Sequence, residues 1–235
     1  MTKESTLYEM LVEDTLEARH GLRFLKGYGE RGAVIYNEAH VAARDGSVHP
    51  DFAPYYEGQL LFYLHQTMFL KLASDCGLES WVDRCEQNGF PSAVVKMGRF
   101  HFTNHHGASP SEVKCLNPSL MRAQNSNINM SLLQGNLFEP PFDNNKLRKA
   151  NNIYGNFIHG CRGTGNTFTA DGFMQIAFPC VADVENTEDA QKKLRYVERY
   201  SLYSLINHVT TCQNERRRIA LPKVRIISPK IKKQQ

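Results

Sequence analysis

The stretch from residue 151 to residue 183 most restricts the fold, because two apolar runs flank a glycine-rich segment there. The runs cover residues 153–158 and 173–180. Phe, Ile, Tyr and Val are enriched in both runs, and Gly, Asn and Asp bound them. This pattern predicts a β-hairpin with a long loop. A hairpin alone is marginally stable in water, so its apolar face needs a further strand or a helix.

Hydrophobic periodicity elsewhere predicts helices that can cover this sheet. The expected helices are residues 7–25, 55–72, 79–88, 118–134 and 187–209. The expected further strands are residues 33–36, 92–105 and 223–227. We therefore expect an α+β fold, in which an antiparallel sheet of about four to five strands packs against several helices.

The chain length of 235 residues suits a single α+β domain, residues 1–235. Residues 135–149 are rich in Pro, Asn and Asp, which is typical of a linker or an exposed loop. They mark a possible subdivision into a helix-rich part, residues 1–134, and a sheet-plus-helix part, residues 150–235.

Composition restricts the cellular setting. Hydrophobic residues make up 41% of the chain, yet no apolar run is long enough to span a bilayer, so no membrane partner is expected. Acidic residues occur throughout the first twenty positions, which is unlike a signal peptide. The six cysteines are far apart and form no CxxC motif. This pattern favours reduced thiols in a cytoplasmic protein and gives no support to a structural zinc site.

The positive charge is concentrated near the C-terminus. The net charge is +4, and no Asp or Glu follows Glu215. Such asymmetry favours a polyanionic partner, and nucleic acid before a lipid surface. The alternative is a solvated tail that keeps the protein in solution. The candidate nucleic-acid-binding residues are Arg216, Arg217, Arg218, Lys223, Arg225, Lys230, Lys232 and Lys233, together with Arg162 in the glycine-rich loop.

The predicted strand at residues 92–105 carries the candidate catalytic residues. In a strand, Arg99, His101, Thr103 and His105 would project from one face at steps of about 7 Å. Two imidazoles beside a guanidinium could hold a phosphate and transfer a proton at neutral pH. The alternative is the solvated face of a half-buried sheet. Because His101 and His105 would lie about 13 Å apart, no metal or other cofactor is expected there.

Two short motifs point in the same direction. The sequence His101-Phe102-Thr103 resembles the His-x-Thr element of two-histidine phosphoesterases, and the second match is His208-Val209-Thr210. That family carries both copies on strands. The resemblance implies that the chain is a phosphodiester-processing enzyme. Residues 160–167 look like a phosphate-binding P-loop, although Asn166 stands where the motif has lysine.

These features predict a nucleic-acid-binding protein that uses the basic C-terminal segment, with possible phosphodiester cleavage at the polar strand. The rival hypothesis is a non-catalytic protein-interaction module, such as an inhibitor or a regulatory subunit. Its contact surface would be the aromatic-rich segments near Tyr55–Tyr56 and residues 138–142. The sequence does not indicate an oligomeric state.

Overall fold

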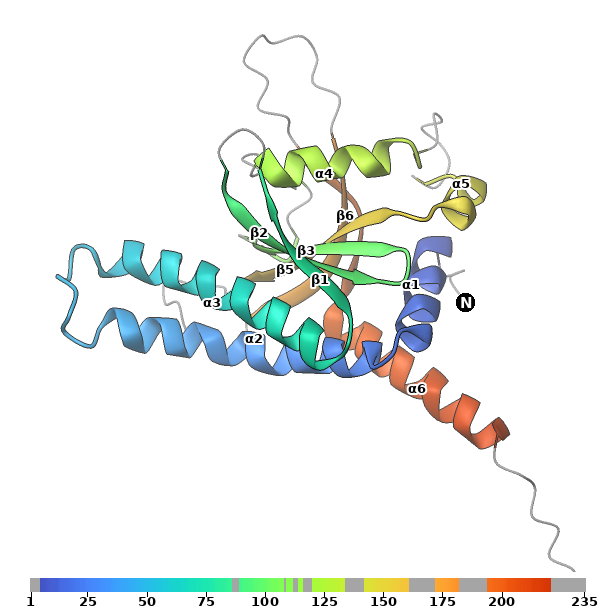
Figure 1. Cartoon of the computed structure of the whole chain (residues 1–235), viewed down its shortest axis with the longest axis horizontal. Helices are drawn as coiled ribbons and strands as arrows, with labels where there is room; N and C mark the ends of the chain where they lie inside the picture. Colours follow the sequence, from blue (N-terminus) through green and yellow to red (C-terminus); the bar gives the residue numbers. More distant parts are fainter. Residues whose placement is uncertain are drawn as a thin grey trace, which may run out of the picture.

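A computed structural model gives the fold and describes residues 5–85, 89–107, 109–111, 114–115, 120–133, 142–160, 172–181 and 194–220. In this part of the chain a seven-stranded sheet lies between a group of helices on one face and one helix on the other (Figure 1). The strands are β1 (Glu79–Arg84), β2 (Pro91–Met97), β3 (Phe100–His106), β4 (Lys114–Cys115), β5 (Ile153–Gly160), β6 (Phe173–Val181) and β7 (Leu194–Ser201).

The sheet is mixed, with the strand order β1-β2-β3-β5-β6-β7-β4. Its central pair, β3 and β5, is parallel, and the other neighbours are antiparallel. The expected α+β class is confirmed. The expected antiparallel sheet of about four to five strands is roughly right but not exact, because the described sheet has seven strands and one of its six neighbouring pairs is parallel. The physical reason is the connection between β3 and β5, which includes a helix and returns the chain to the same end of the sheet. The two strands come from either side of the possible subdivision at residues 135–149.

The predicted strand at residues 92–105 is two strands, β2 and β3, joined by a tight turn. Gly98 lies in this turn with a φ of 60°. A side chain at this position would also collide with the carboxylate of Asp14. Glycine therefore permits both the left-handed backbone and the close approach of α1.

Six helices are described. They are α1 (Thr6–Glu17), α2 (Gly21–Ala43), α3 (Ala53–Asp75), α4 (Leu120–Met130), α5 (Asn144–Lys149) and α6 (Leu202–Ala220). Helices α2 and α3 pack side by side as a long hairpin, and α4 crosses the opposite face of the sheet (Figure 1). The helices predicted at residues 55–72 and 118–134 correspond to α3 and α4.

Three helix and strand predictions in the first half of the chain are wrong. The helix expected at residues 7–25 is divided into α1 and α2 near His20, which has a φ of 62°. Helix α2 then continues through residues 33–36, where a strand was expected. Residues 79–84 form the edge strand β1 instead of a helix.

The helix expected at residues 187–209 is also wrong in part, since residues 194–201 form β7 and α6 begins at Leu202. Leu194 and Val197 are three residues apart and continue the apolar periodicity of α6, so the two elements look like one helix in the sequence. The predicted strands at residues 153–160 and 172–181 match β5 and β6. The predicted strand at residues 223–227 lies outside the described residues.

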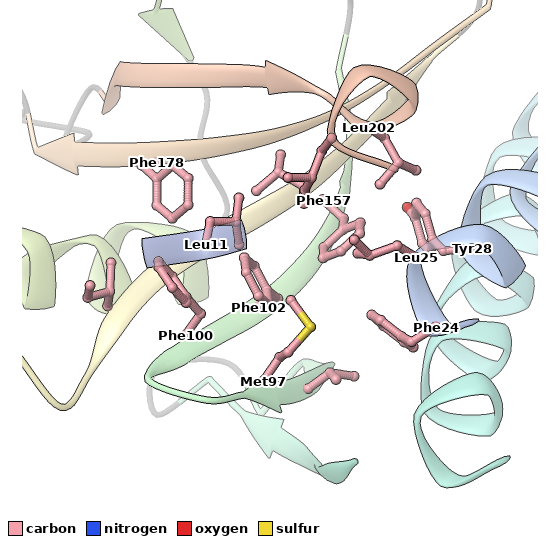
Figure 2. Packing of buried hydrophobic residues seen from close by; sticks show 14 of the residues in the cluster. Leu11, Phe24, Leu25, Tyr28, Met97, Phe100, Phe102, Phe157, Phe178 and Leu202 are labelled. Atoms are coloured by element: carbon pink, nitrogen blue, oxygen red, sulfur yellow. The ribbon is translucent and has the colours of Figure 1, made fainter. Parts of the chain in front are cut away.

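Aromatic rings fill the core between the sheet and helices α1, α2, α3 and α6 (Figure 2). The ring of Phe157 on β5 lies 5.1 Å from Phe102 on β3 and 5.3 Å from Phe69 on α3. Each of these side chains is fully buried, which contributes about 1.5–3 kcal/mol per residue. This core fixes the direction of β3. Phe100 and Phe102 face the helices, so His101, Thr103 and His105 face α4.

Candidate functional site

Arg99, the first member of the predicted catalytic row, lies in the turn before β3 and is held by Asp14 of α1. The Arg99 Nη2 and Nε donate to the carboxylate at 2.8 and 3.0 Å, and the backbone N–H of Arg99 donates at 2.7 Å. Asp14 is buried, so this is a bidentate ion pair with little solvent around it. The expectation that Arg99 shares a strand face with the histidines is wrong, because the turn at Gly98 directs it toward α1.

His101 is half-buried, and a different cation lies beside it. Its cross-strand partner is Lys96 on β2, and its ring lies 5.7 Å from that of Trp81 on β1. Burial lowers the pKa of His101 below its ordinary value, and the positive charge of Lys96 acts in the same direction. A hydrogen bond with Asn152 and the charge of Glu79 act in the opposite direction. The imidazole is therefore mostly neutral at pH 7.

Thr103 and His105 belong to a hydrogen-bond network between the sheet and α4. The hydroxyl of Thr103 donates to Asn156 Oδ1 at 3.0 Å. It also lies 2.6 Å from both His105 Nε2 and the hydroxyl of Tyr154. Because the threonine has one hydroxyl proton, the latter two groups act as donors to its oxygen. This assignment places a proton on Nε2 of His105.

The pKa directions agree with this assignment. Burial raises the pKa of Tyr154, so its phenol keeps its proton. Burial, followed by the charge of Arg122, lowers the pKa of His105 well below its ordinary value. Asn156 Nδ2 is the buried atom of this network that makes no hydrogen bond with the described residues.

Helix α4 is attached to this face of the sheet by Asn129. Its side-chain amide donates to the carbonyls of Tyr154 and Pro179 at 2.7 and 2.8 Å, and its Oδ1 accepts from the N–H of Tyr154 at 2.9 Å. Pro179 has no N–H, and the pairing of β6 with β7 shifts register beside it. Asn129 thus supplies hydrogen bonds where the backbone hydrogen-bond ladder of the sheet is interrupted. The four residues predicted to form one catalytic row therefore occupy three different surroundings.

The predicted nucleic-acid-binding residues are described in part. Arg216 and Arg217 are exposed in the last turns of α6, and Arg218 belongs to the same helix. The remaining candidates lie outside the described residues, and these are Arg162, Lys223, Arg225, Lys230, Lys232 and Lys233. His208, from the second His-x-Thr match, lies on α6 with its Nδ1 3.1 Å from the hydroxyl of Tyr8. The two matches are therefore not a pair of strands.

A second histidine cluster, which the sequence did not reveal, lies on the opposite face of the sheet. His65 of α3 stacks on His159 of β5 with 3.6 Å between ring centroids, and the hydroxyl of Tyr36 lies 2.7 Å from His159 Nδ1. His106, the last residue of β3, is the register partner of His159. A cavity of about 330 Å³ lies beside these three rings. The parallel pairing of β3 with β5 brings His106 and His159 together, and no sequence pattern marks His65.

The two stacked histidines of this cluster, His65 and His159, are neutral at pH 7. Burial lowers the pKa of His65 to about 3 and lowers the pKa of His159 well below its ordinary value. Neutral imidazoles are the form that binds metals, yet the stacked rings of His65 and His159 do not converge on one point. Among the described residues, no group of three or more His, Cys, Asp or Glu side chains is arranged to hold a metal ion.

Comparison with known proteins gives no relative: no family model, no curated protein and no solved structure matches this chain. No helix in the described part of the chain has the length and apolar character needed to cross a membrane. The function must therefore be argued from the geometry of the sites.

Proposed function

We propose that this protein binds nucleic acid through the basic end of α6 and the residues that follow it. The supporting observation is the position of Arg216 and Arg217, which are exposed on a helix that extends away from the sheet and the other helices (Figure 1). From Arg216 to Lys233 the sequence contains eight Lys or Arg and no acid. A helix C-terminus favours cations in its last turn, but its dipole does not account for cations that continue beyond the helix.

Phosphate neutralisation makes this proposal measurable by salt dependence. Each phosphate that a cation neutralises adds about −0.7 to the slope of log K against log salt for a single strand, and about −0.9 for a duplex. The experiment is fluorescence anisotropy of a labelled oligonucleotide at several salt concentrations. The double variant Arg216→Ala/Arg217→Ala should reduce the magnitude of the slope by about one to two units and weaken binding to all sequences.

The matched control is Arg19→Ala/Arg31→Ala, which removes the same charge from exposed positions outside α6. This control should bind as the native protein does. If both double variants lose affinity equally, net charge explains the binding of the oligonucleotide and the end of α6 has no special role. Binding that does not depend on salt would overturn the proposal.

Phosphodiester cleavage is the finer part of the proposal, and it centres on His101. What supports it is the surface formed by Lys96, His101 and Trp81 on three adjacent strands. Lys96 would supply the cation that Arg99 cannot, although its Nζ also lies 3.2 Å from Glu79. Trp81 is partly exposed and offers a ring on which a base could stack. Thr103 and His105 would position this surface through their hydrogen bonds under α4.

A non-catalytic protein-interaction module is the second candidate, favoured by exposed aromatic residues around the first turns of α3. Tyr55, Phe52 and Tyr63 are 75%, 65% and 54% exposed. Tyr55 and Tyr63, together with Phe62 and Phe90, line a groove of about 530 Å³. Exposed aromatic residues at such density are typical of contact surfaces. Phe142, from the other aromatic segment, is buried in the core and cannot be a contact residue.

The variant Tyr55→Ser/Tyr63→Ser separates this candidate from nucleic-acid binding. If the aromatic surface joins copies of the chain, sedimentation velocity of the native protein should show association that the variant lacks. Oligonucleotide affinity should be the same in both proteins. A native protein that stays monomeric at all concentrations would remove self-association from consideration.

A further inference from the structure

The cavity beside the second histidine cluster has the polarity of a ligand site. It is lined by residues of α3, β3 and β5, including His65, Gln66, Asn104, His106 and His159. Its volume of about 330 Å³ is at the lower end of the range of roughly 300–1,000 Å³ that small-molecule sites occupy. Gly58 and Phe62 line both this cavity and the aromatic groove next to it. A molecule in the cavity could therefore extend outward along α3.

His65 indicates that the cavity has an occupant. Its side chain is 1% exposed, and neither Nδ1 nor Nε2 makes a hydrogen bond with the described residues. An imidazole buried without partners is destabilising, because its nitrogens lose their hydrogen bonds to water and gain none in the protein. Most buried polar groups in native proteins have a partner, so an exception beside a cavity indicates a ligand or an ordered water.

The other polar groups of the wall already have protein partners. Gln66 Oε1 accepts from the N–H of Ala93, and Gln66 Nε2 donates to the carbonyl of Asn104. Asn104 Oδ1 accepts from the Tyr28 hydroxyl at 3.2 Å, and its Nδ2 donates to the carbonyl of His65 at 3.2 Å. These hydrogen bonds hold the side chains of Gln66 and Asn104 in place. His65, by contrast, has two ring nitrogens that make no hydrogen bond with the described residues.

The wall also restricts the chemistry of the occupant. No Asp, Glu, Lys or Arg is among the described residues that line the cavity. The lowered pKa values of His65 and His159 keep these two imidazoles neutral, so these two side chains offer no positive charge to an anion. Phe62 and the imidazoles of His65, His106 and His159 supply flat rings. An occupant that is uncharged, flat and able to donate and accept hydrogen bonds satisfies all these conditions.

We propose that this cavity binds an uncharged planar nitrogen heterocycle of the nucleobase class, hydrogen-bonded to His65 and packed against Phe62. The nucleobase can belong to a free nucleoside or to a single-stranded nucleic acid, in which unstacked bases insert into such pockets. The proposal does not depend on the basic end of α6. That end concerns phosphates, whereas no Lys or Arg is among the described residues that line the cavity.

The test is isothermal titration calorimetry of the full chain with adenosine, guanosine, cytidine and uridine. At least one nucleoside should bind at a single site. The variant His65→Phe keeps a flat ring and removes both nitrogens, so it should weaken binding by about tenfold or more. The matched control is His49→Phe, at an exposed histidine outside the cavity, which should bind as the native protein does.

A blocking variant gives a second measurement that does not depend on His65. Gly58 lies in α3 and has no atom within 4 Å of the position where a side chain would begin. Replacing Gly58 with Leu should fill the mouth of the cavity and abolish binding, whereas Gly58→Ala should retain it. Both variants should keep the native melting temperature or raise it, because glycine is unfavourable inside a helix.

The outcomes decide the proposal. Loss of binding in His65→Phe and Gly58→Leu, with retention in His49→Phe and Gly58→Ala, supports the cavity. No heat with any nucleoside at millimolar concentration overturns it, and so does equal affinity in Gly58→Leu and Gly58→Ala. Benzoate and benzyl alcohol test the ligand class: binding of either as strong as that of the best nucleoside overturns a nucleobase site.

A short single-stranded oligonucleotide distinguishes the two sources of the base. If Gly58→Leu weakens binding of the oligonucleotide as much as binding of the nucleoside, the cavity accepts a base from a strand. If it weakens binding of the nucleoside alone, the natural ligand is the free molecule. Failure of the α6 variants to affect oligonucleotide binding would overturn the proposed function and leave the nucleoside result unchanged.

Discussion

The imidazole of His65 on α3 stacks on the imidazole of His159 on β5, with 3.6 Å between centroids and 14° between ring planes. Two positive charges at this distance would repel strongly with little water to screen them. The hydroxyl of Tyr36 lies 2.7 Å from His159 Nδ1 and fixes one ring of the pair. The contact between α3 and the centre of the sheet therefore requires neutral histidines.

This requirement predicts loss of stability in acid. The pKa of His65 is lowered from 6.5 to about 3, chiefly by burial, so between these values the unfolded chain binds a proton that the folded chain does not. The contribution of the neutral ring is complete above about pH 6.5 and is lost as the pH falls. Each pH unit in this interval reduces the free energy of unfolding by at most about 1.4 kcal/mol per histidine. Urea unfolding at pH 7.5, 6 and 5 measures the slope.

The variant His65→Phe should have a shallower dependence on pH than the native protein, because one of the buried titrating groups is gone. At pH 7.5 it should be about as stable as the native protein, since an apolar ring replaces unsatisfied nitrogens. His49→Phe, at an exposed position, should keep the native slope. Equal slopes in all three proteins would show that the stacked pair does not control acid stability.

The ion pair of Asp14 with Arg99 predicts a large loss of stability on removal of the acid. Asp14→Ala would leave the guanidinium and the N–H of Arg99 without their partner, at a loss of about 3–5 kcal/mol. Glu13 also lies near Arg99, at 3.6 Å, but it is mostly exposed, so Glu13→Ala should change stability by less than about 1 kcal/mol. Urea unfolding of both variants at pH 7.5 provides the comparison. Similar losses at the two positions would contradict a structural role for the Asp14 pair.

The amide of Asn129 predicts a separate effect at α4. Asn129→Ala would remove hydrogen bonds to the backbone of Tyr154 and Pro179 and leave buried groups unsatisfied. We expect a loss of about 2–4 kcal/mol, since each such group contributes about 1–3 kcal/mol. Asn127→Ala, at an exposed position on the same helix, should have little effect. Thermal unfolding followed by circular dichroism measures both, and a stable Asn129→Ala protein would show that α4 is held by other contacts.

Sequence reasoning found the elements whose periodicity is continuous over their full length. The hairpin of β5 and β6 and the apolar helix α3 were located correctly, because their buried positions recur at regular steps. Residues 92–105 show why strand turns were missed. Gly98 is the one typical turn residue there. The core positions change phase across it, from Val95 and Met97 to Phe100 and Phe102, and a single strand does not allow for this change. Leu194 and Val197 misled in the opposite way, because their spacing of three extends the helical periodicity of α6 into a segment that forms β7.

The sites were less predictable, because both depend on contacts between distant residues. Parity within β3 correctly placed His101, Thr103 and His105 on one face, but the ion pair of Arg99 with Asp14 spans 85 positions. His65 is one of several polar residues in α3 and gives no local signal. Its role depends on His159, which reaches it only after β5 pairs in parallel with β3. Local patterns determine which face a residue occupies, and long-range topology determines its neighbours.

The cleavage proposal predicts a specific effect of His101 on rate and pH dependence. If the native protein cleaves a labelled single-stranded oligonucleotide, His101→Ala should reduce the rate by about 10²–10⁴, which is the usual contribution of a general base. The imidazole acts as a base in its neutral form, and its pKa is lowered from 6.5, chiefly by burial. Activity should therefore be constant from about pH 6.5 to pH 8 and fall below that range as His101 is protonated. Because His101 is half-buried, its replacement should leave the melting temperature within a few degrees of the native value.

A matched histidine variant, His49→Ala, should keep full activity, and Lys96→Ala should raise KM through loss of a phosphate contact. Absence of cleavage by the native protein, or full activity in His101→Ala, would exclude this surface as a cleavage centre. Neither outcome would affect binding through α6.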